Sequence, residues 1–374
     1  MQVPDPHIIQ RENLDAGIAE APNADAVFVV WAGDRSAYMA KTGMLRRRLL
    51  RVFKPLDGAA PRRSLNLREV ATRIEYWPTG SRFESMLVHY ALARRYFPED
   101  YPRLIKLRMP PYVKLILGNE FPRTQVSTRL SASGAVHYGP FQSRAGAELF
   151  QDQFLDLFQI RRCQENLEPS AQHPGCIYGE MNKCLRPCQQ VVTREEYLSE
   201  VERVREFLTG NGAGMISVVA AARDRLSAEM DFEEAARQHK RLERIQAVLA
   251  LRGDLACDID RLYGVAVAPS PLPDSVLLWF VCQGAWQAPV EFALISPHFT
   301  SMVSLDQRLR ELVGSVQPVM PSLAEKQEHL ALLARWRFST WSDGEWIGFP
   351  SLDQAPYRKL VRAISRVSQK AASV

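Results

Sequence analysis

Four of the chain's six cysteines fall within 26 residues, and no other feature limits the fold so strongly. They are Cys163, Cys176, Cys184 and Cys188, separated by 12, 7 and 3 residues. Two disulfides are one explanation, but the opening residues carry Asp, Glu and Pro without the basic and then apolar order of a secretion signal. Because thiols in the cytoplasm stay reduced, the sequence favours four thiolates that share one inorganic centre.

Two kinds of inorganic centre use four cysteines. Structural zinc takes thiolates that come as two close pairs, with roughly two to four residues inside each pair. Here only Cys184 and Cys188 are that close. An iron–sulfur cluster is also held by four thiolates, and it accepts uneven spacing. The cysteines alone therefore leave both centres open.

The residues that flank the cysteines favour one centre. They read Phe158-Gln-Ile-Arg-Arg-Cys163, then Pro174-Gly-Cys176-Ile-Tyr178, then Cys184-Leu-Arg-Pro187-Cys188. This stretch resembles the cysteine-rich segment of UvrC, the incision subunit of bacterial nucleotide excision repair. The resemblance implies that Cys163, Cys176, Cys184 and Cys188 hold a 4Fe-4S cluster, with zinc as the alternative.

Positive charge is concentrated in one part of the chain, although the net charge is only +5. Basic residues crowd the stretch from 46 to 129, including Arg46, Arg47, Arg48, Arg51, Lys54, Arg62, Arg63, Arg94 and Arg95. A clustered basic face is typical of proteins that bind the phosphate backbone of DNA, although a solvated helix face explains any single run. No apolar run is long enough for a membrane span, so we expect a cytoplasmic protein.

The N-terminal part resembles the GIY-YIG nuclease domain that opens UvrC. A predicted strand over 26–31 is followed by a turn at 32–35, a second strand around 37–40, and a helix with Leu45, Leu49 and Leu50 on its apolar side. The first family motif falls on Ala26-Val27-Phe28, the second on Tyr38-Met39-Ala40-Lys41, and the essential arginine on Arg48, ten residues after Tyr38.

Three positions depart from the family pattern. Phe28 replaces a tyrosine and so lacks a hydroxyl, and Ala40 replaces a glycine. The metal-binding glutamate of the family becomes His89, on a helix that reads Glu84-Ser85-Met86-Leu87-Val88-His89. A magnesium site wants carboxylate oxygen, whereas imidazole suits zinc, nickel or copper.

The resemblance therefore implies a degenerate nuclease site at Tyr38, Lys41, Arg48 and His89, with the divalent metal in doubt. In this site Arg48, with Lys41, supplies the cation that stabilises the scissile phosphate, and Tyr38 is the surviving phenol. We expect a UvrC-like repair protein that binds DNA more than it cuts it. The alternatives are an active structure-selective endonuclease that uses an unusual metal, and an iron–sulfur adaptor that does not bind DNA.

A helical hairpin is predicted behind the cysteines. Thr193 and Glu196 form a capping box for a helix that ends near residue 210, a second helix covers about 213–229, and a third begins at Phe232 after a turn at Met230-Asp231. The hairpin resembles the UVR motif, which implies docking on a UvrB-type partner. The residues that would dock are Phe232, Glu233, Ala235, Ala236 and Leu242, with Phe232 plugging the turn. A self-contained helix pair is the alternative.

The sequence predicts an α+β protein in six segments. They are an irregular lead-in (1–24), a GIY-YIG-like domain (25–100), a connector (101–160), the cysteine-rich segment (161–210), the UVR hairpin (211–254) and a small α+β domain of unknown role (255–374). Ser143 is expected to cap a helix whose Phe150, Phe154 and Phe158 form a core stripe. In the last domain, strands are expected near 262–268, 275–282 and 290–295, and helices near 304–314, 322–336 and 356–369.

Overall fold

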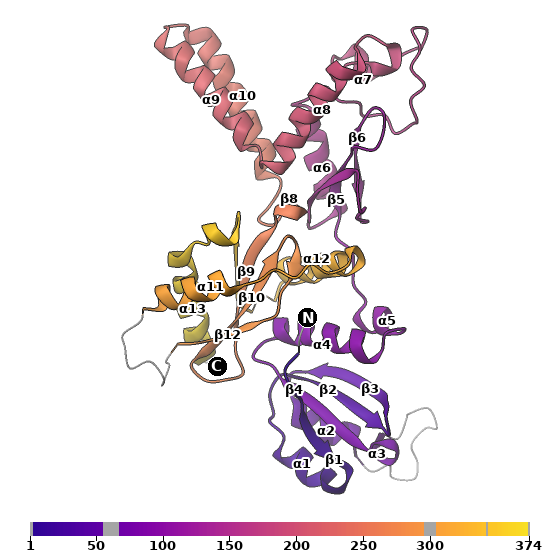
Figure 1. Cartoon of the computed structure of the whole chain (residues 1–374), viewed down its shortest axis with the longest axis vertical. Coiled ribbons are helices and arrows are strands. Elements are labelled where there is room, and N and C mark those ends of the chain that lie inside the picture. The colour runs from indigo at the N-terminus through magenta and orange to yellow at the C-terminus, as the bar shows by residue number, and fades with distance from the viewer. Residues whose placement is uncertain (1–2, 55–66, 295–303, 342, 373–374) are drawn as a thin grey trace.

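The computed structural model describes residues 3–54, 67–294, 304–341 and 343–372, and it confirms the α+β class. Within these residues the chain forms three antiparallel sheets, one in each of three parts (Figure 1). We call these parts the N-terminal lobe (3–105), the middle region (111–258) and the C-terminal lobe (259–372). No helix of the described ranges combines the length and apolar character needed to cross a membrane.

The N-terminal lobe is a sheet covered by helices on both faces. Its strand order is β1-β4-β2-β3, and β2 is buried on both faces, as its continuous apolar sequence requires. One face packs against α1 and α2, and the other packs against α4. Its elements are β1 (His7–Gln10), η1 (Arg11–Asn13), α1 (Leu14–Glu20), β2 (Ala26–Ala32), β3 (Arg35–Thr42), α2 (Leu45–Val52), α3 (Leu67–Val70), β4 (Arg73–Pro78), α4 (Arg82–Tyr96) and α5 (Tyr101–Ile105).

Two sequence predictions for this lobe are wrong. Residues 1–24 are not an irregular lead-in, because residues 7–10 form β1, which pairs Ile9 with Ile74 of β4 and completes the sheet. Leu50 is not on the apolar side of α2, because it is 56% exposed while Leu45 and Leu49 are buried. Leu50 lies about 100° around the helix from Leu49, which is enough to turn it into solvent.

The middle region joins a small sheet to four long helices around one core. The sheet has the order β6-β5-β7-β8. Ser143 accepts the Gly146 N–H and caps α6, and Phe150, Phe154 and Phe158 are buried, so both predictions for this helix are confirmed. The elements are β5 (Tyr112–Ile116), β6 (Arg123–Ser127), β7 (Ala135–Gly139), α6 (Arg144–Leu155), α7 (Ile177–Glu180), η2 (Pro187–Gln189), α8 (Arg194–Thr209), α9 (Ala213–Ala228), α10 (Phe232–Ala250) and β8 (Cys257–Asp258).

The helical hairpin of α9 and α10 forms as predicted and projects away from the sheets, diverging from α8 so that the two form a V (Figure 1). The capping box of Thr193 and Glu196 that opens α8 is present. At the root of the hairpin, Leu242 and Ile245 of α10 pack in the same hydrophobic cluster as Tyr197 of α8 and Phe154 of α6. The connector, the cysteine segment and the hairpin therefore share one core.

The C-terminal lobe is an antiparallel sheet of order β11-β10-β9-β13, with β12 also pairing β10. The helices α11 and α13 cover one face and α12 covers the other. The predicted strands and helices of this lobe are confirmed within a few residues, apart from residue 295, which lies outside the described ranges. The elements are η3 (Ile259–Arg261), β9 (Tyr263–Pro269), β10 (Ser275–Cys282), β11 (Ala285–Trp286), β12 (Val290–Ala293), α11 (Leu305–Ser315), α12 (Leu323–Arg337), β13 (Glu345–Phe349), η4 (Leu352–Gln354) and α13 (Tyr357–Ala372).

The helix α4 belongs to both lobes. It is apolar on nearly every side, and a helix of that kind must be buried all round. It lies between the N-terminal sheet and the C-terminal lobe (Figure 1), in a cluster that contains Val29 of β2 as well as Trp279 and Trp336 of the far lobe. The ring of Phe83 lies 4.3 Å from that of Trp336, between centroids. The C-terminal lobe even caps α4, because the Asp343 carboxylate accepts the backbone N–H groups of Arg82 and Phe83.

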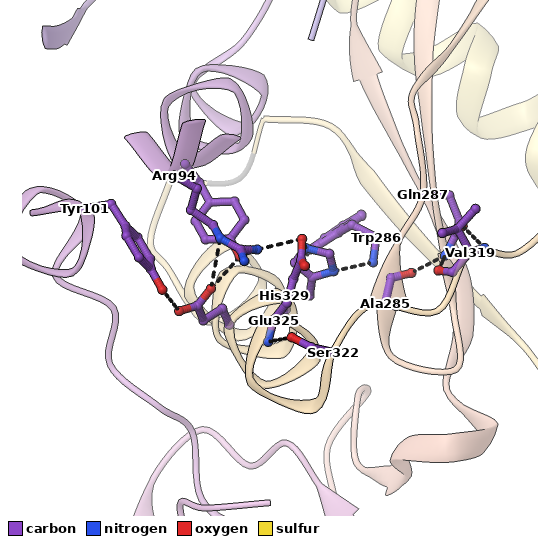
Figure 2. A network of polar contacts seen from close by, with 11 residues as sticks. Arg94, Tyr101, Ala285, Trp286, Gln287, Val319, Ser322, Glu325 and His329 are labelled. Carbon is purple, nitrogen blue, oxygen red and sulfur yellow. Dashed lines mark hydrogen bonds and ion pairs between the residues drawn. The ribbon is translucent and has the colours of Figure 1, made fainter. Parts of the chain in front are cut away.

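A network of polar contacts at the far end of α4 completes this interface (Figure 2). Arg94 forms an ion pair with Glu325 of α12 at 2.6 Å. The hydroxyls of Tyr90 and Tyr101 donate to the Glu328 carboxylate at 2.6 and 2.7 Å. Arg94 was assigned by sequence to a basic face, but it is only partly exposed and its charge is compensated within the protein.

Candidate functional site

The four cysteines lie in an irregular segment between α6 and α8, at the upper right of Figure 1, where only α7 and η2 are regular. Cys184 and Cys188 are buried, Cys163 is partly buried and Cys176 is exposed. All six cysteines of the chain are free, so the disulfide explanation fails. Two of the four sulfurs are therefore fixed in the interior, and two lie near the surface.

Residues Phe121 and Pro122 of the connector hold this segment in place. Arg161, which is buried, donates from Nε to the Phe121 carbonyl at 2.9 Å. Tyr197 of α8 donates its hydroxyl to the Pro122 carbonyl at 2.7 Å and accepts the Arg161 N–H at 3.0 Å. These bonds tie residues 121–122 to Arg161 before the four cysteines and to Tyr197 after them.

The four thiols affect one another electrostatically. Burial raises the pKa of Cys184 to about 11, the Arg186 N–H partly offsets this, and the charges of Cys163, Cys176 and Cys188 raise it further. Burial also raises the pKa of Cys188, and the charges of Cys176 and Cys163 add to it. Both thiols therefore resist ionisation, and a bound cation would favour their thiolate forms.

The donor set fits a thiolate-bound centre in its chemistry. The Arg186 N–H donates to Cys184 Sγ at 3.4 Å and Arg161 Nη1 to Cys163 Sγ at 3.6 Å, and such bonds to sulfur tune metal–thiolate centres. Across the described ranges, however, no three His, Cys, Asp or Glu side chains are arranged so that they could hold a metal ion. The choice between an iron–sulfur cluster and zinc therefore stays a prediction.

The predicted nuclease residues fall into two groups. Arg48 on α2 donates from Nη2 to the Tyr38 hydroxyl on β3 at 3.0 Å. The Tyr38 ring lies 5.9 Å from the ring of Phe28, which is fully buried at the position of the missing tyrosine. This first group lies on the sheet face that packs against Leu45 and Leu49 of α2.

Lys41 and His89 lie on the opposite face of the sheet. Met39 packs in the cluster that contains α4, and because side chains alternate along a strand, Lys41 shares the face of Met39 and not that of Tyr38. Burial lowers the pKa of His89 to about 4, and the positive charges of Lys41 and Arg335 add to the shift. Partial burial, Arg335 and Arg82 also lower the pKa of Lys41, although that residue is exposed as a whole.

This division has a chemical consequence for metal binding. An imidazole that ligates a divalent cation gains from nearby carboxylates, but the charged neighbours that act on His89 are both cations. The positive charges of Lys41 and Arg335 disfavour the binding of a metal cation at His89. The sheet brings Tyr38 and Arg48 together and separates them from the position of the metal ligand.

Most exposed residues of the predicted basic face sit on α2, with Lys54 just after it and Arg95 on α4. Arg46, Arg47 and Arg51 are exposed and Arg48 is partly buried, whereas Arg62 and Arg63 lie outside the described residues. Arg46 donates from Nε to the Ala21 carbonyl at 2.7 Å, which fixes the base of this helix. The predicted basic face is therefore smaller than the sequence suggests, but it adjoins Tyr38.

The hairpin residues divide between the helix–helix contact and the solvent. Ala235 and Leu242 are buried, whereas Glu233 and Ala236 are exposed. The prediction that Phe232 plugs the turn is wrong, because the residue is 66% exposed. Its neighbour Met230 adopts a left-handed conformation with φ of 61° and is 74% exposed, so the tip of the hairpin carries an uncovered apolar patch.

Sequence comparison gives a domain match and a set of relatives. Residues 111–207 match the UvrC/Cho excinuclease middle domain. The chain is 23% identical over 73% of its length to the UvrABC system protein C of Lachnospira eligens, and 28% identical over 57% to that of Carboxydothermus hydrogenoformans. It is 26% identical over 64% to that of Bdellovibrio bacteriovorus.

The chain spans 45%, 35% and 38% of these three relatives' own lengths. No solved structure matches the chain with significance. The matched middle domain contains all four cysteines together with the Phe121-Pro122 contacts that support them. The chain is thus similar to UvrABC system protein C over part of its length, and residues 111–207 match the UvrC/Cho excinuclease middle domain.

Proposed function

We propose that this protein acts in nucleotide excision repair as a UvrC-like subunit that binds DNA and a UvrB-type partner and does not itself cut DNA. The observation that carries the proposal is the middle-domain match over residues 111–207. Exposed arginines on α2 supply a surface for the phosphate backbone. The separation of Arg48 from His89 by the sheet argues against a competent nuclease.

The central test is a binding and nicking assay on damaged duplex DNA. We expect duplex binding that weakens as salt concentration rises, because phosphate contacts release counterions, and no nicking with magnesium, manganese, zinc or nickel. Nicking that disappears in the Arg48→Ala variant would instead establish an active endonuclease, the alternative that the Arg48–Tyr38 contact favours. Absence of salt-sensitive duplex binding would identify an adaptor that does not act on DNA.

In the cysteine segment we propose a 4Fe-4S cluster held by Cys163, Cys176, Cys184 and Cys188, with zinc as the alternative. The buried pair, the N–H groups that donate to sulfur and the mutual repulsion of the thiolates support a thiolate-bound cation. When bound, the cluster would cross-link residues 163–188 and stabilise the middle region. Arg161 and Tyr197 position the segment for it.

Metal content tests this assignment directly. Anaerobically purified protein is expected to contain iron and sulfide and to absorb near the cluster's charge-transfer bands, and Cys184→Ser and Cys188→Ser are each expected to lose most of the iron, since all four ligands are needed. Cys282→Ala, in the core of the C-terminal lobe, is the matched control and should retain it. Zinc in place of iron would select the alternative, and metal-free protein would exclude both.

For the partner, we propose that the tip of the hairpin docks on a UvrB-type protein. The exposed Phe232 and Met230 form an apolar patch that has no other role in the described structure. Glu233 pairs with Arg237 on the same surface, at 2.7 Å, and would form the polar rim.

Removal of the exposed ring tests this surface. Phe232→Ala is expected to weaken binding to a UvrB-type protein by about tenfold or more, as measured by calorimetry, because an aromatic anchor at an interface is worth about 2 kcal/mol. Thermal stability should not change, because the side chain is already in solvent. Leu272→Ala, an equally exposed apolar residue of the C-terminal lobe, should bind normally. Unchanged affinity of Phe232→Ala would remove the tip from the interface.

A further inference from the structure

A cavity of about 890 Å³ lies between the two lobes, apart from the cysteines and from the nuclease face. We call it the interlobe cavity. Its walls come from the N-terminal segment 3–7, the end of β4 with the start of α4, and strands β10 and β12 of the C-terminal lobe with the loops beside them. The volume is in the range of sites that enclose small organic ligands. None of the functions proposed above uses it.

Apart from His7, the titratable side chains that line the cavity are all acidic. Asp5, Asp25 and Glu84 come from the N-terminal lobe and Glu291 from the C-terminal lobe, and no Lys or Arg lines the cavity within the described residues. The whole chain has the opposite balance, with 47 basic and 42 acidic residues. The cavity is therefore a local concentration of negative potential in a basic protein.

Two of these carboxylates are held rigidly and offer a free oxygen. Glu84 is only 6% exposed, and its Oε2 accepts the Gly80 N–H at 2.7 Å. Glu291 Oε1 accepts the hydroxyls of Ser270 and Ser275 at 2.9 and 2.8 Å. The second oxygen of each has no hydrogen-bond partner in the described part of the chain. Glu84 is buried, whereas Glu291 is exposed and is oriented by the two serine hydroxyls, so each lobe supplies one acceptor.

Tryptophan rings complete the wall. Trp77 is 2% exposed and donates its indole N–H to the Pro4 carbonyl at 2.8 Å, which holds the N-terminal segment over the cavity. Trp279 also lines the cavity and is 1% exposed, yet its indole N–H has no partner among the described residues. Indole rings attract organic cations, so both residues add a favourable aromatic surface to the wall.

We propose that the interlobe cavity binds a small organic cation, an amine or a guanidine carried on an apolar or aromatic body. The cation would pair with the free oxygens of Glu84 and Glu291, and the body would pack on Trp77 and Trp279. Burial raises the pKa of Glu84 to about 8, and the charge of Glu291 adds to the shift. Glu84 is therefore largely protonated near neutral pH without ligand, and a bound cation would lower its pKa and favour the carboxylate. Because the partners of the ligand come from both lobes, the ligand would also tighten their contact.

Calorimetry with the full chain tests the proposal, and tryptamine is the probe. It combines an ammonium group with an aromatic body, and indolepropionate has the same body with the opposite charge. Tryptamine is expected to bind with one saturable site, and indolepropionate is not. Glu84→Gln and Glu291→Gln should each weaken tryptamine binding by about tenfold or more, since a hydrogen bond to a charged group is lost. Glu243→Gln on the exposed side of α10 is the matched control.

Three results would overturn the proposal. They are absence of tryptamine binding, equal binding of the anion, and full affinity in both glutamine variants that fold normally by circular dichroism. Asp25→Asn is a further variant at the cavity wall that leaves Glu84 and Glu291 intact and should also weaken tryptamine binding, so the test does not depend on the folding of one protein. The experiment involves neither DNA nor metal, so its failure would leave the proposed repair role untouched.

Discussion

Replacing Phe83 with alanine is expected to lower the free energy of unfolding by about 3–5 kcal/mol, the usual cost of deleting a buried aromatic ring. Phe83 is fully buried where the lobes meet, and its ring centroid lies 4.3, 5.5 and 6.1 Å from those of Trp336, Trp286 and Trp279. The vacated volume cannot be refilled easily, because large side chains from both lobes surround it. Urea unfolding followed by tryptophan fluorescence measures the loss.

The same substitution should also loosen the two lobes from each other. Limited proteolysis of Phe83→Ala is expected to cut between the lobes sooner than in the parent protein. Phe150→Ala is the control, because that ring is equally buried but lies in the core of the middle region. It should cost similar stability without separating the lobes. An unchanged unfolding midpoint in Phe83→Ala would show that the interface in Figure 1 does not hold the lobes together.

Stability is expected to fall steeply as the pH drops from about 6.5 to 4. Burial lowers the pKa of His89 and of His137 to about 4 each, with positive neighbours adding, and burial lowers that of His329 to about 3. A histidine whose pKa is lower in the folded state binds more protons when unfolded, so its contribution is complete above pH 6.5 and is lost as the pH falls. Each group contributes on the order of 3 kcal/mol at most.

Glu84 acts in the opposite direction. Burial raises the pKa of this carboxyl to about 8, so the folded state holds its proton more tightly, and that contribution is lost as the pH rises from 4.5 through 8. The two effects together place maximum stability near pH ~6.5. Urea unfolding across the pH range measures the curve. His137→Gln should flatten the acidic limb, and His239→Gln on the exposed side of α10 should leave it unchanged. Equal midpoints at pH 7 and pH 4.5 would contradict the assignment.

The parts of the fold that sequence predicted well depend on local signals. The Ser143 cap and the box of Thr193 and Glu196 act within one helical turn, so their meaning does not depend on the rest of the molecule. Strands of the C-terminal lobe followed from apolar runs between turns. The edge strand β1 was missed because its register is set by β4, where Ile9 pairs with Ile74, 65 residues later, and its four residues give no alternation that marks a strand.

Long-range partners explain the remaining errors. Arg94 was assigned to a DNA-binding face because it lies in a basic run, but its counter-ion Glu325 is on a helix of the other lobe. Trp336 of α12 and Trp346 of β13 also meet in the core, because Trp336 is only 1% exposed and the two ring centroids lie 6.5 Å apart. Neither outcome follows from neighbours in sequence.

At the candidate nuclease site, one of the two spatial relations was predicted from the sequence. The ten-residue interval correctly paired Tyr38 with Arg48, which are joined at 3.0 Å. The other relation, the separation of Lys41 from Tyr38, could have been predicted from the alternation of side chains along a strand. These residues are three positions apart and must point to opposite faces. The place of Glu84 beside Glu291 appears only once the lobes are together.

Because both lobes pack on helix α4, neither lobe can be changed or removed independently of the other. The N-terminus of α4 is capped by Asp343 and its apolar surface is covered by Trp279 and Trp336. The helix is therefore fully capped and buried only when the last hundred residues have been synthesised. A fragment that ended after the hairpin would expose α4 as an apolar, uncapped helix on its surface and would be prone to aggregate. Exchanging the front lobe for that of a relative would fail for the same reason, unless the back lobe were exchanged with it.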